Sequence, residues 1–576
     1  MAGRDPNNFL KLLESPGRTA DYHLFRVDGR EMLSQPYEFR MTLRSNGDIP
    51  DAATWIGASV SFVMGLSDNV QRKVNGQCVR FEHAYQKGQY VEFVLDIAPT
   101  LSKLRLKRDN RIFVEKTAKQ VIAEVLREHA IVFDDSKIRN PHPKREYCVQ
   151  YMETDFDFIS RLMEREGVFY YFRYDEGAGQ FKHKMYLADD PSGYFDGEPF
   201  KLSFRRDHLL RGLEQVETSY AAATGGWIAR DYDFKQPRTA LNTRTPTSLP
   251  HGDKSASVRD WPAGVPTAAE VSRRSKLAME EAEASAVTLE GVGAYVNFTP
   301  GARFEIDDPR LTPRERRIAV RSVVHAAWDP PGLEEGEPSY QQQFTATPSQ
   351  RAYRPPAVTP PALVRGPQTG VVVDQRDPEG FGRIKVRFHW DDRGASTCWL
   401  RVAQQWAGDR IGAQWIPRVG MEVLVDFLEG DPDRPIVTGC IYNGDNKHPF
   451  PVPAELHKSG WRTETHPTGS VINAFVFDDK SGAEEIYTFA GRDFRRETKK
   501  DETVTVGGNR SVTVTGNYSM KATGSMSLKS TGTGEVHSTA PLTISSSTSI
   551  TIKVGGSSIS ISPIGISISG PLVKIN

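Results

Sequence analysis

The chain has 576 residues, which is too many for one hydrophobic core, so several domains are expected. Its 73 Lys and Arg residues balance its 73 Asp and Glu residues. Proteins that coat nucleic acid or bind membrane surfaces usually carry a basic excess, so this balance disfavours both classes, although a local basic patch is compatible with it.

The start of the chain, MAGRDPNNFLKLLE, is charged and polar where a signal peptide has its apolar core. No apolar run approaches the ~20 residues that span a bilayer. We therefore expect a protein made in the cytoplasm, whose export does not use a cleaved leader. The four cysteines are Cys78, Cys148, Cys398 and Cys440, and they form no C-x-x-C motif. We therefore expect buried free thiols, and a bridge between Cys398 and Cys440 is the less favoured alternative.

Residues 1–350 combine strand-like and helical patterns. The runs SVSFVM, QYVEFVLDI and GVFYYFRYD are rich in β-branched and aromatic residues, as strands are. A helix is predicted in TAKQVIAEVLREHA, which opens with a capping box at Thr117 and Gln120. Another, TAAEVSRRSKLAMEEAEASA, repeats the box with Thr267 and Glu270, and its polar composition predicts a surface position.

The helix predicted between these two, DFDFISRLMEREG, has carboxylates near both ends. One interpretation gives a catalytic role to Asp155 and Asp157, or to Glu164 and Glu166. Acids in the first turn also favour the helix dipole, and Gly167 supplies a stop. Capping and a solvated face are therefore the favoured interpretation.

The second half of the chain divides by composition. The proline-rich stretch YRPPAVTPPALVRGPQ predicts a stiff, extended linker without a core over 351–366. Five strand-like runs then fill 367–446, namely GVVVDQ, RIKVRFHW, CWLRVAQ, MEVLVDFL and PIVTGCIY, and they suit a small barrel of the oligonucleotide/oligosaccharide-binding (OB) type. A neck over 447–483 and a repetitive needle over 484–576 complete the predicted organisation.

The repetitive segment has a glycine every eight residues, at Gly508, Gly516, Gly524 and Gly532, which we expect at tight corners. Apolar residues alternate between them, as in strands with one buried face. Turn residues shift the phase at Gly555–Gly556 and after Pro563, so that isoleucines keep one face: Ile559, Ile561, Ile564, Ile566 and Ile568. The residues expected to point inward are Val504, Val506, Val512, Val514, Met520, Ala522, Leu528, Val536, Ile544, Ile550 and Ile552.

One ribbon of short strands cannot enclose its own apolar stripe, and its edges invite pairing with other chains. Two closures are open: a single-chain solenoid, or several identical chains wound into a prism. A disordered Ser/Thr/Gly tail is the third interpretation. The constant eight-residue spacing, with the apolar residues always on the same face, disfavours disorder and indicates a rigid rod. A trimer is favoured over a single-chain solenoid, because eight residues are few for one turn of a single-chain coil.

Several long blocks resemble one family. GFGRIKVRFHWDD, CWLRVAQQWAG, IPRVGMEVLVDFLEGDPDRPIVTGCIYN and DDKSGAEEIY are similar to the VgrG family, the spike of bacterial type VI secretion systems. Upstream, VDGREMLSQPYEFR, NRIFVEKTAKQVIAEVL and EYCVQYMETDFDFISRLMEREGVFYYF match the same family, so the resemblance covers nearly the whole chain.

The resemblance implies a mainly β homotrimer with some α-helix. Residues 1–350 would be a phage-hub-like base of two barrel-like domains seated on the hexameric tail tube, followed by the OB barrel and a trimeric intertwined β-helix (β-prism) needle. It implies contacts with baseplate components, effectors and a loading adaptor, and transient contact with the target membrane. The spike would be cytoplasmic before firing and would then be secreted or injected into the target cell.

The resemblance also implies a cap on the needle, a small cone protein of the PAAR type. Clustered aliphatic residues and open strand ends are a liability unless covered. By the inward parity, Val573 and Ile575 would lie near the axis. We expect the cone to dock on Gly570, Pro571, Leu572, Val573, Lys574, Ile575 and Asn576.

No enzymatic chemistry, cofactor or metal is expected. The ~40 residues between Gly444 and Ala483 leave no room for the peptidoglycan-cleaving domain of a related phage spike. The chain shows no G-x-S-x-G, H-E-x-x-H or Walker motif, and no toxin domain is expected after Asn576. The one histidine after residue 500, His537, is on the outward parity, which disfavours a metal at the needle axis.

Three other functions are compatible with parts of the sequence. A spike with a cryptic peptidoglycan hydrolase is disfavoured by the missing domain and motifs. Nucleic-acid binding through the barrel would use Arg383, Lys385 and Arg387, but alternation assigns these to an ordinary solvated strand face. The spike of a phage or of an extracellular contractile injection particle is the nearest alternative.

Overall fold

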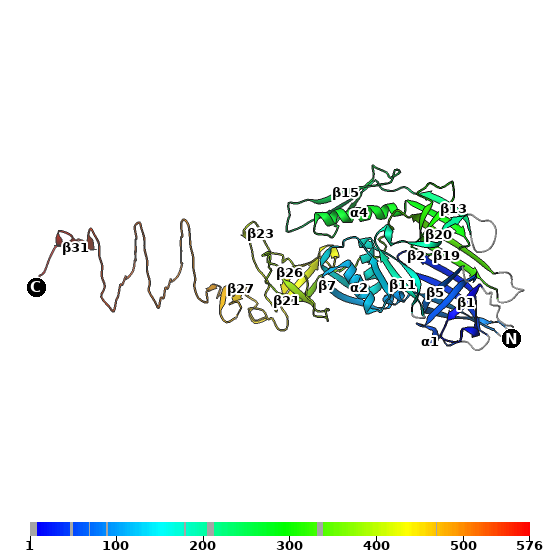
Figure 1. Ribbon diagram of the computed structural model, residues 1–576. Helices are drawn as coiled ribbons and strands as arrows, with labels where there is room; N and C mark the ends of the chain where they lie inside the picture. The colour runs from blue at the N-terminus through cyan, green and yellow to red at the C-terminus, as the bar shows by residue number, and fades with distance from the viewer. Residues whose placement is uncertain are drawn as a thin grey trace. The chain divides into compact units, whose positions relative to one another are not determined.

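A computed structural model describes residues 9–45, 50–67, 70–87, 90–177, 180–203, 212–330, 338–467 and 469–575 (Figure 1). The chain forms two units. The larger comprises residues 1–462 and 475–487, and the smaller comprises 463–474 and 488–576.

The base of the larger unit is one twelve-stranded sheet. Its first part has the order β1-β4-β5-β6-β3-β2 and its second part the order β19-β20-β17-β13, with β18 pairing β19 and β12 pairing β18. The strands are β1 (Leu10–Glu14), β2 (Tyr22–Met32), β3 (Gln35–Ser45), β4 (Ser59–Ser67), β5 (Val70–Lys87), β6 (Tyr90–Ala98), β12 (Phe195–Ser203), β13 (Leu213–Tyr220), β17 (Val287–Gly293), β18 (Ala302–Asp307), β19 (Arg317–Trp328) and β20 (Ser339–Pro348).

The two parts of this sheet are joined by antiparallel pairing of β2 with β19, from Met32 opposite Ser322 to Arg26 opposite Trp328. Each part has its own apolar core. The first surrounds Phe39, Phe62 and Phe93, and the second surrounds Phe298 and Phe304, all fully buried. The base is therefore one continuous sheet with two apolar cores.

Two helices pack in the base as the sequence predicts. In α2 (Ala118–Glu128) the Thr117 Oγ1 accepts from the Gln120 N–H and the Gln120 side chain accepts from the Thr117 N–H, so the capping box is confirmed. The apolar face of α2 is buried, and it comprises Val121, Ile122, Val125 and Leu126. Helix α3 (Asp155–Glu166) ends at Gly167, whose φ of 69° is the left-handed conformation of a glycine C-cap.

Helix α4 (Ala268–Ala284) is capped by Thr267, whose hydroxyl oxygen accepts from the Glu270 N–H. The predicted capping box is only half formed, because the Glu270 carboxylate accepts from the Thr267 hydroxyl rather than from the Thr267 N–H. Helix α4 is not wholly a surface helix, because Val271, Ala278 and Met279 are buried; Val271 belongs to a small core beside β14 and β15. The remaining elements of the base are α1 (Ala52–Trp55), β7 (Arg108–Thr117), β8 (Phe133–Lys137), β9 (Lys144–Thr154), β10 (Phe169–Gly177), β11 (Gln180–Ala188), β14 (Gly226–Asp231), β15 (Leu241–Pro246) and β16 (Val258–Asp260).

The OB barrel contains the strand order β22-β21-β25-β26. Its strands are β21 (Gln368–Asp374), β22 (Lys385–Phe388), β25 (Glu422–Phe427) and β26 (Pro435–Ile441). The predicted fifth strand, CWLRVAQ, makes only single bridges, Leu400 with Ile384 and Val402 with Val437. These bridges link the two edges of the sheet, so this run closes the barrel without being a regular strand.

The proline-rich linker is extended, as predicted, but it is also docked on the base. Tyr353 is buried against Phe169 and Tyr194. The buried Arg354 donates hydrogen bonds to the carbonyl oxygens of Gly167 and Asp189 at 2.8 and 2.7 Å. The linker therefore holds the barrel close to the base rather than spacing it away.

The predicted neck contains a sheet of three strands, β27 (Lys458–Glu464), β28 (Ile472–Asp478) and β29 (Glu485–Phe489). This sheet extends past the expected boundary at residue 483. Beyond it, the first regular strands are β30 (Ile550–Val554), β31 (Ser557–Ser562) and β32 (Gly565–Ser569).

All four cysteines are free. Cys78 and Cys148 are buried as expected, whereas Cys440 is exposed. In the described part of the chain, no helix has both the length and the apolarity needed to cross a membrane.

Candidate functional site: the octad segment and the polar networks of the base

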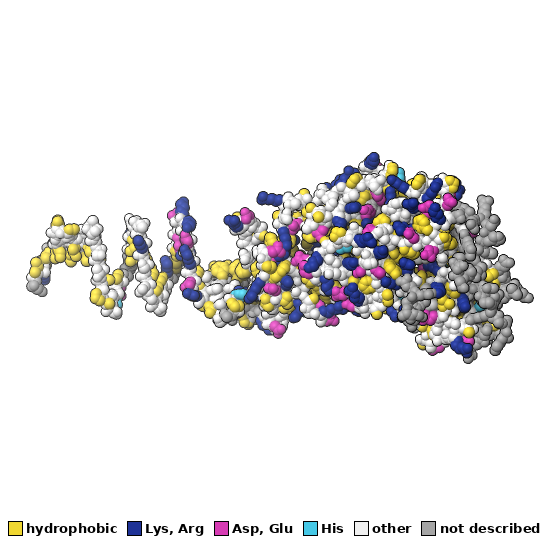
Figure 2. Space-filling model, viewed as in Figure 1, with side chains coloured by type: hydrophobic (Ala, Val, Ile, Leu, Met, Phe, Trp, Pro, Cys, Tyr) yellow, Lys and Arg dark blue, Asp and Glu magenta, His cyan; other side chains and the backbone are white. Residues whose placement is uncertain are grey.

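We call residues 504–548, which contain the eight-residue repeat, the octad segment. Its aliphatic side chains are exposed in the single chain. Val512 is 61% exposed, Met520 64% and Leu528 90%. The other predicted inward residues in this segment, Val504, Val506, Val514, Ala522, Val536 and Ile544, are exposed as well. Figure 2 shows hydrophobic side chains lying open along this segment. A chain with this alternation and no internal cover needs another surface to bury its stripe.

Bends recur every eight residues along the segment. They fall at 507–508, 515–516, 523–524 and 531–532, which are the octad glycines and their predecessors, and they continue at 539–540 and 547–548. The octad glycines lie at these bends, as expected, but in the single chain the neighbouring atoms do not require glycine there. A Cβ at Gly508 or Gly516 would meet nothing within 4 Å, and Ala540 occupies the same phase without a glycine.

The last strands keep their isoleucines in register. Strand β31 pairs antiparallel with β30 and β32, placing Ile552 opposite Ile559 and Ile559 opposite Ile568. Ile550, Ile561 and Ile566 form the second cross-strand row. The predicted phase shift at Gly555–Gly556 is thus confirmed. Ile564 is the exception, because it occupies the turn before Gly565 and is 99% exposed.

The predicted cone-docking segment follows β32. Leu572 is 73% exposed, Val573 44% and Ile575 90%. Gly570 packs closely, since a Cβ there would lie 2.8 Å from the Ser557 Oγ. Asn576 lies outside the described residues. The structure thus leaves three aliphatic side chains uncovered here.

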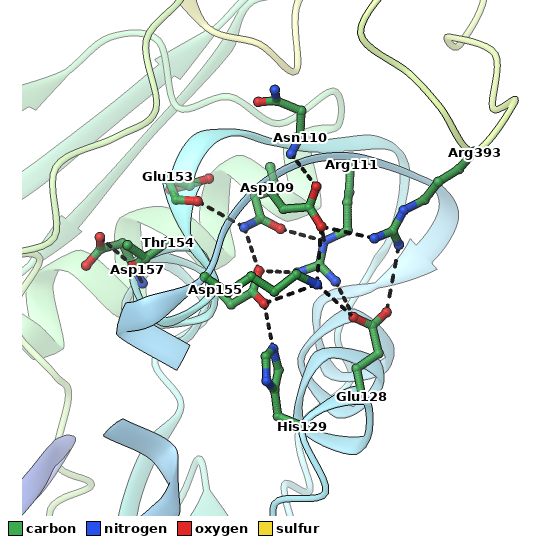
Figure 3. A network of polar contacts seen from close by, with 12 residues as sticks. Asp109, Asn110, Arg111, Glu128, His129, Glu153, Thr154, Asp155, Asp157 and Arg393 are labelled. Atoms are coloured by element: carbon green, nitrogen blue, oxygen red, sulfur yellow. Dashed lines mark hydrogen bonds and ion pairs between the residues drawn. The ribbon is translucent and has the colours of Figure 1, made fainter. Parts of the chain in front are cut away.

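The carboxylates of α3 are bound within the base rather than displayed to solvent. Asp155 is 0% exposed, and its Oδ1 accepts hydrogen bonds from Arg111 Nη2 at 2.6 Å and from Gln150 Nε2 at 2.8 Å. The Nε2 atom of His129 lies 2.6 Å from Asp155 Oδ2 (Figure 3). The solvated-face interpretation is therefore wrong for Asp155, because β7 supplies Arg111 and β9 supplies Gln150.

Asp157 has the predicted capping role. Its N–H donates to Thr154 Oγ1 at 3.0 Å, and its carboxylate accepts from the same hydroxyl at 2.7 Å. Glu164 accepts a hydrogen bond at 2.7 Å from the Thr359 hydroxyl, and burial raises its pKa. Both side chains therefore stabilise the local structure.

Glu166 is buried, and three cationic or protonatable side chains compensate the negative charge of its carboxylate. Burial alone would raise its pKa, but the hydrogen bond with His142 and the charges of Arg145 and Arg273 hold the pKa well below its usual range. Arg145 Nη2 donates to Glu166 Oε1 at 2.6 Å. A general acid needs a pKa near the working pH, so Glu166 is unsuited to that role.

The three basic residues predicted to share one solvated strand face lie in different environments. Arg383 is 1% exposed, and its guanidinium donates to Asp377 at 2.7 Å and to Glu379 at 2.8 Å. Lys385 lies over the ring of Trp399, and Arg387 is exposed. This strand therefore presents no row of three free cations. Among the described residues, no group of three or more His, Cys, Asp and Glu side chains is placed to hold a metal ion.

Three family descriptions match successive parts of the chain. The phage tail baseplate hub (GPD) matches residues 30–331, and the type VI secretion system/phage-baseplate injector OB domain matches 368–442. The bacteriophage T4 gp5 C-terminal trimerisation domain matches 459–562.

Curated relatives align with most of the chain. The type VI secretion system spike protein VgrG1b of Pseudomonas aeruginosa is 31% identical over 526 residues, which cover 87% of this chain and 70% of that protein. VgrG1a of the same organism is 31% identical over 509 residues, covering 84% of this chain and 77% of that protein.

Solved structures share the fold. The E. coli c3393 protein, a type VI component similar to the T4 tail proteins gp27 and gp5, aligns with a TM-score of 0.54 and 20% identity. It covers 75% of this chain, and 99% of that chain is aligned. A chain of the half-lidded Francisella PdpA-VgrG complex aligns with a TM-score of 0.52 and 10% identity, covering 84% of this chain and 87% of its own.

The continuous base sheet, the OB barrel and the octad segment define a hub-and-spike protein of a contractile tail. With the trimerisation match, the spike is trimeric. The chain belongs to the VgrG family of type VI secretion system spike proteins.

Proposed function

We propose that this chain is a non-enzymatic spike at the tip of a type VI tail tube, and that three copies wind residues 484–576 into a needle that punctures the target envelope. The observation that carries the proposal is the exposed aliphatic stripe of the octad segment, where Val512 and Met520 are 61% and 64% exposed in the single chain. This stripe lies inside the part of the chain that matches a trimerisation domain.

Three copies give a prism without an open edge. In the octad segment each copy contributes one strand and one corner per layer. The apolar residues of each strand face the axis, while Ser, Thr and Lys face water. Burying one such aliphatic side chain contributes about 1.5–3 kcal/mol, so the needle core of three chains gains strongly from assembly. Stiffness, rather than chemistry, is the property that penetration requires.

The partners follow from the proposed position. Residues 1–350 dock on the hexameric tail tube and the baseplate, and Gly570 to Asn576 form the docking face of a PAAR-type cone, whose passengers are effectors loaded by an adaptor. The uncovered Leu572 and Ile575 support a cover at this point. The spike waits in the cytoplasm and enters the target cell on firing.

The proposal includes the absence of hydrolase activity. Its support is that the acidic side chains of α3 bind partners inside the base, and that residues 458–489 form a sheet rather than a further catalytic domain. Cleavage of purified peptidoglycan by the wild-type protein, abolished by one carboxylate or serine substitution, would refute this part.

Two experiments test the assembly. Sedimentation equilibrium of the purified chain at micromolar concentration should give the mass of three copies, and a monomer would contradict the proposal. Deleting Pro571 to Asn576 should leave that trimer intact but abolish pull-down of the cone. If the truncated spike retains the cone at wild-type strength, the docking face lies elsewhere.

A further inference from the structure

Six large apolar side chains lie exposed on the larger unit around the OB barrel and the sheet that follows it. We call them the collar patch. Their exposed fractions run from 37% to 67%, and they are Trp406, Ile411, Trp415, Trp461, Phe475 and Phe477. Exposed aromatic residues gathered in this way are typical of interaction surfaces.

The patch is ordered rather than loose. Trp415 stacks on Trp461 with ring centroids 6.1 Å apart and an interplanar angle of 10°. Trp461 in turn lies 6.1 Å from Phe475 at 18°, and Phe475 lies 5.1 Å from Phe477 edge to face. Phe475 and Phe477 are two residues apart in β28, so they share a face, and the buried Val476 takes the other.

A hairpin arm carries the rest of the patch. It contains β23 (Ala407–Gly408) and β24 (Ile411–Gly412) and stands off from the barrel strands in Figure 1. The Gln404 side chain joins the two ends of the arm, because it accepts a hydrogen bond from the Trp415 N–H at 2.9 Å and donates one to the Trp415 carbonyl oxygen at 3.1 Å. Gly412 is required at its corner, because its φ is 149° and a Cβ would lie 2.2 Å from the Trp406 carbonyl oxygen.

We propose that the collar patch is covered by the neighbouring copies of this chain, and that this contact sets the register in which the three octad segments wind together. The inference rests on the proposed trimeric needle. Trp461, Phe475 and Phe477 lie within the part that matches a trimerisation domain, which begins at residue 459 and continues into the octads. The surface is therefore continuous in sequence with the trimer-forming segment.

The octads need such a register device because their own pattern is ambiguous. A chain that slips by eight residues places Val512 beside Met520 and Met520 beside Leu528, so aliphatic residues still meet aliphatic residues and bends still meet bends. Repeated strands of this kind specify register weakly. The collar patch does not repeat: a stacked strip of two tryptophans and two phenylalanines fits a partner in one alignment.

Register is measured in the full chain by cysteine cross-linking, with Cys440→Ser removing the exposed native thiol. Val512→Cys places three thiols at one height on the proposed axis, and mild oxidation should link two of them. Ser511→Cys, one position away on the outward parity, is the matched control and should link poorly. In the double variant Trp461→Ser with Phe475→Ser, the yield from Val512→Cys should fall about threefold or more, since chains slipped by one octad then share the population.

A control separates register from damage. Trp261→Ser with Tyr232→Ser removes two equally exposed aromatics elsewhere on the larger unit, 56% and 48% exposed, and should leave cross-linking unchanged. The thermal transition of the base reports folding of every variant. If the collar variant folds and its Val512→Cys cross-linking matches the wild-type collar, the inference is wrong.

A second variant tests the collar without the needle. Val512→Asp with Met520→Asp disrupts the octad core in the full chain, and the collar should still hold three copies together in sedimentation. A monomer from this variant would overturn the collar inference while leaving the trimeric wild-type spike intact. A monomeric wild-type protein would instead refute the proposed function itself.

Discussion

The carboxylate of Asp433 lies against the backbone of Val149, whose N–H donates a hydrogen bond to Asp433 Oδ1 at 2.7 Å. Asp433 belongs to the turn between β25 and β26 of the OB barrel, and Val149 belongs to β9 of the base. Arg145 Nη1 approaches the other carboxylate oxygen to 4.0 Å. This contact joins barrel to base through a partly desolvated acid, and it makes the junction sensitive to pH.

Asp433→Asn should change the pH dependence of stability. Burial, together with the neighbouring Asp431, raises the pKa of Asp433 from 3.8 to about 6, against the opposing charges of Arg161 and Arg145. The folded state thus keeps this proton to higher pH than the unfolded state. The ionised carboxyl disfavours folding above about pH 6, and that penalty fades as the pH falls toward 4.

The variant should therefore gain stability relative to wild type as the pH rises from about 4 to 7, measured by urea unfolding. Asp134→Asn is a control, because the pKa of Asp134 is shifted in the opposite direction. Hydrogen bonds from Ser136 lower this pKa from 3.8 to about 2, so the ionised carboxyl stabilises the fold above pH 3.8 and this stabilisation is lost as the pH falls from 3.8 to about 2. A stability difference for Asp433→Asn that is constant from pH 4 to 7 would contradict the assignment.

Arg111→Ala should destabilise the base strongly. Arg111 is 1% exposed and donates to Asp155 and Glu128, each at 2.6 Å (Figure 3). Removing it leaves Asp155 buried without its principal cation, a change that typically costs about 3–5 kcal/mol. Arg393→Ala is the matched control, because Arg393 contacts Asp109 at 3.0 Å but is 45% exposed, and such pairs contribute about 0–1 kcal/mol. Denaturant unfolding that gives similar losses for both variants would contradict this difference.

Local rules predicted much of the fold. The capping box at Thr117, the N-cap at Thr267 and the stop at Gly167 are confirmed, because they depend on neighbours within a few residues. The closed barrel was predicted from five strand-like runs, but the run containing Leu400 and Val402 closes it by single bridges. Whether such a run pairs along its length depends on strands far away in sequence.

The failures have different causes. Asp155 looked like a solvated cap, but Arg111 and Gln150 from two other strands bury its charge. Arg383 was assigned outward by alternation, yet β22 begins at Lys385, and alternation holds only inside a paired strand. The collar aromatics were missed altogether, although the two-residue spacing of Phe475 and Phe477 was a visible signal of one apolar strand face.

Val512→Asp should weaken the needle without unfolding the base. In the proposed prism it places three carboxylates together on the axis, and each unpaired buried charge costs several kcal/mol. Lys521→Asp, on the outward parity of the same segment, should be tolerated. Limited proteolysis distinguishes them: the needle of Val512→Asp should be cut readily, and that of Lys521→Asp should resist as the wild type does. Equal resistance of the two would place Val512 outside the core.

Deleting one whole octad should leave a shorter but intact needle. Removal of Asn509 to Gly516 joins Gly508 to Asn517. Every later bend then keeps its place in the eight-residue repeat, and every later aliphatic residue stays on the inward face. Removal of Arg510 to Gly516 takes out seven residues instead of eight. One leg then has nine residues instead of eight, and a shift of one residue turns the following side chains to the opposite face. The aliphatic stripe, exposed throughout the single chain, would then change sides partway along the rod and could not stay on one axis.

We expect the eight-residue deletion to keep protease resistance and the thermal transition of the needle close to wild type, and the seven-residue deletion to lose both. If the two deletions behave alike, the bends and the alternation do not define the needle core, and the prism must be rebuilt on another pattern.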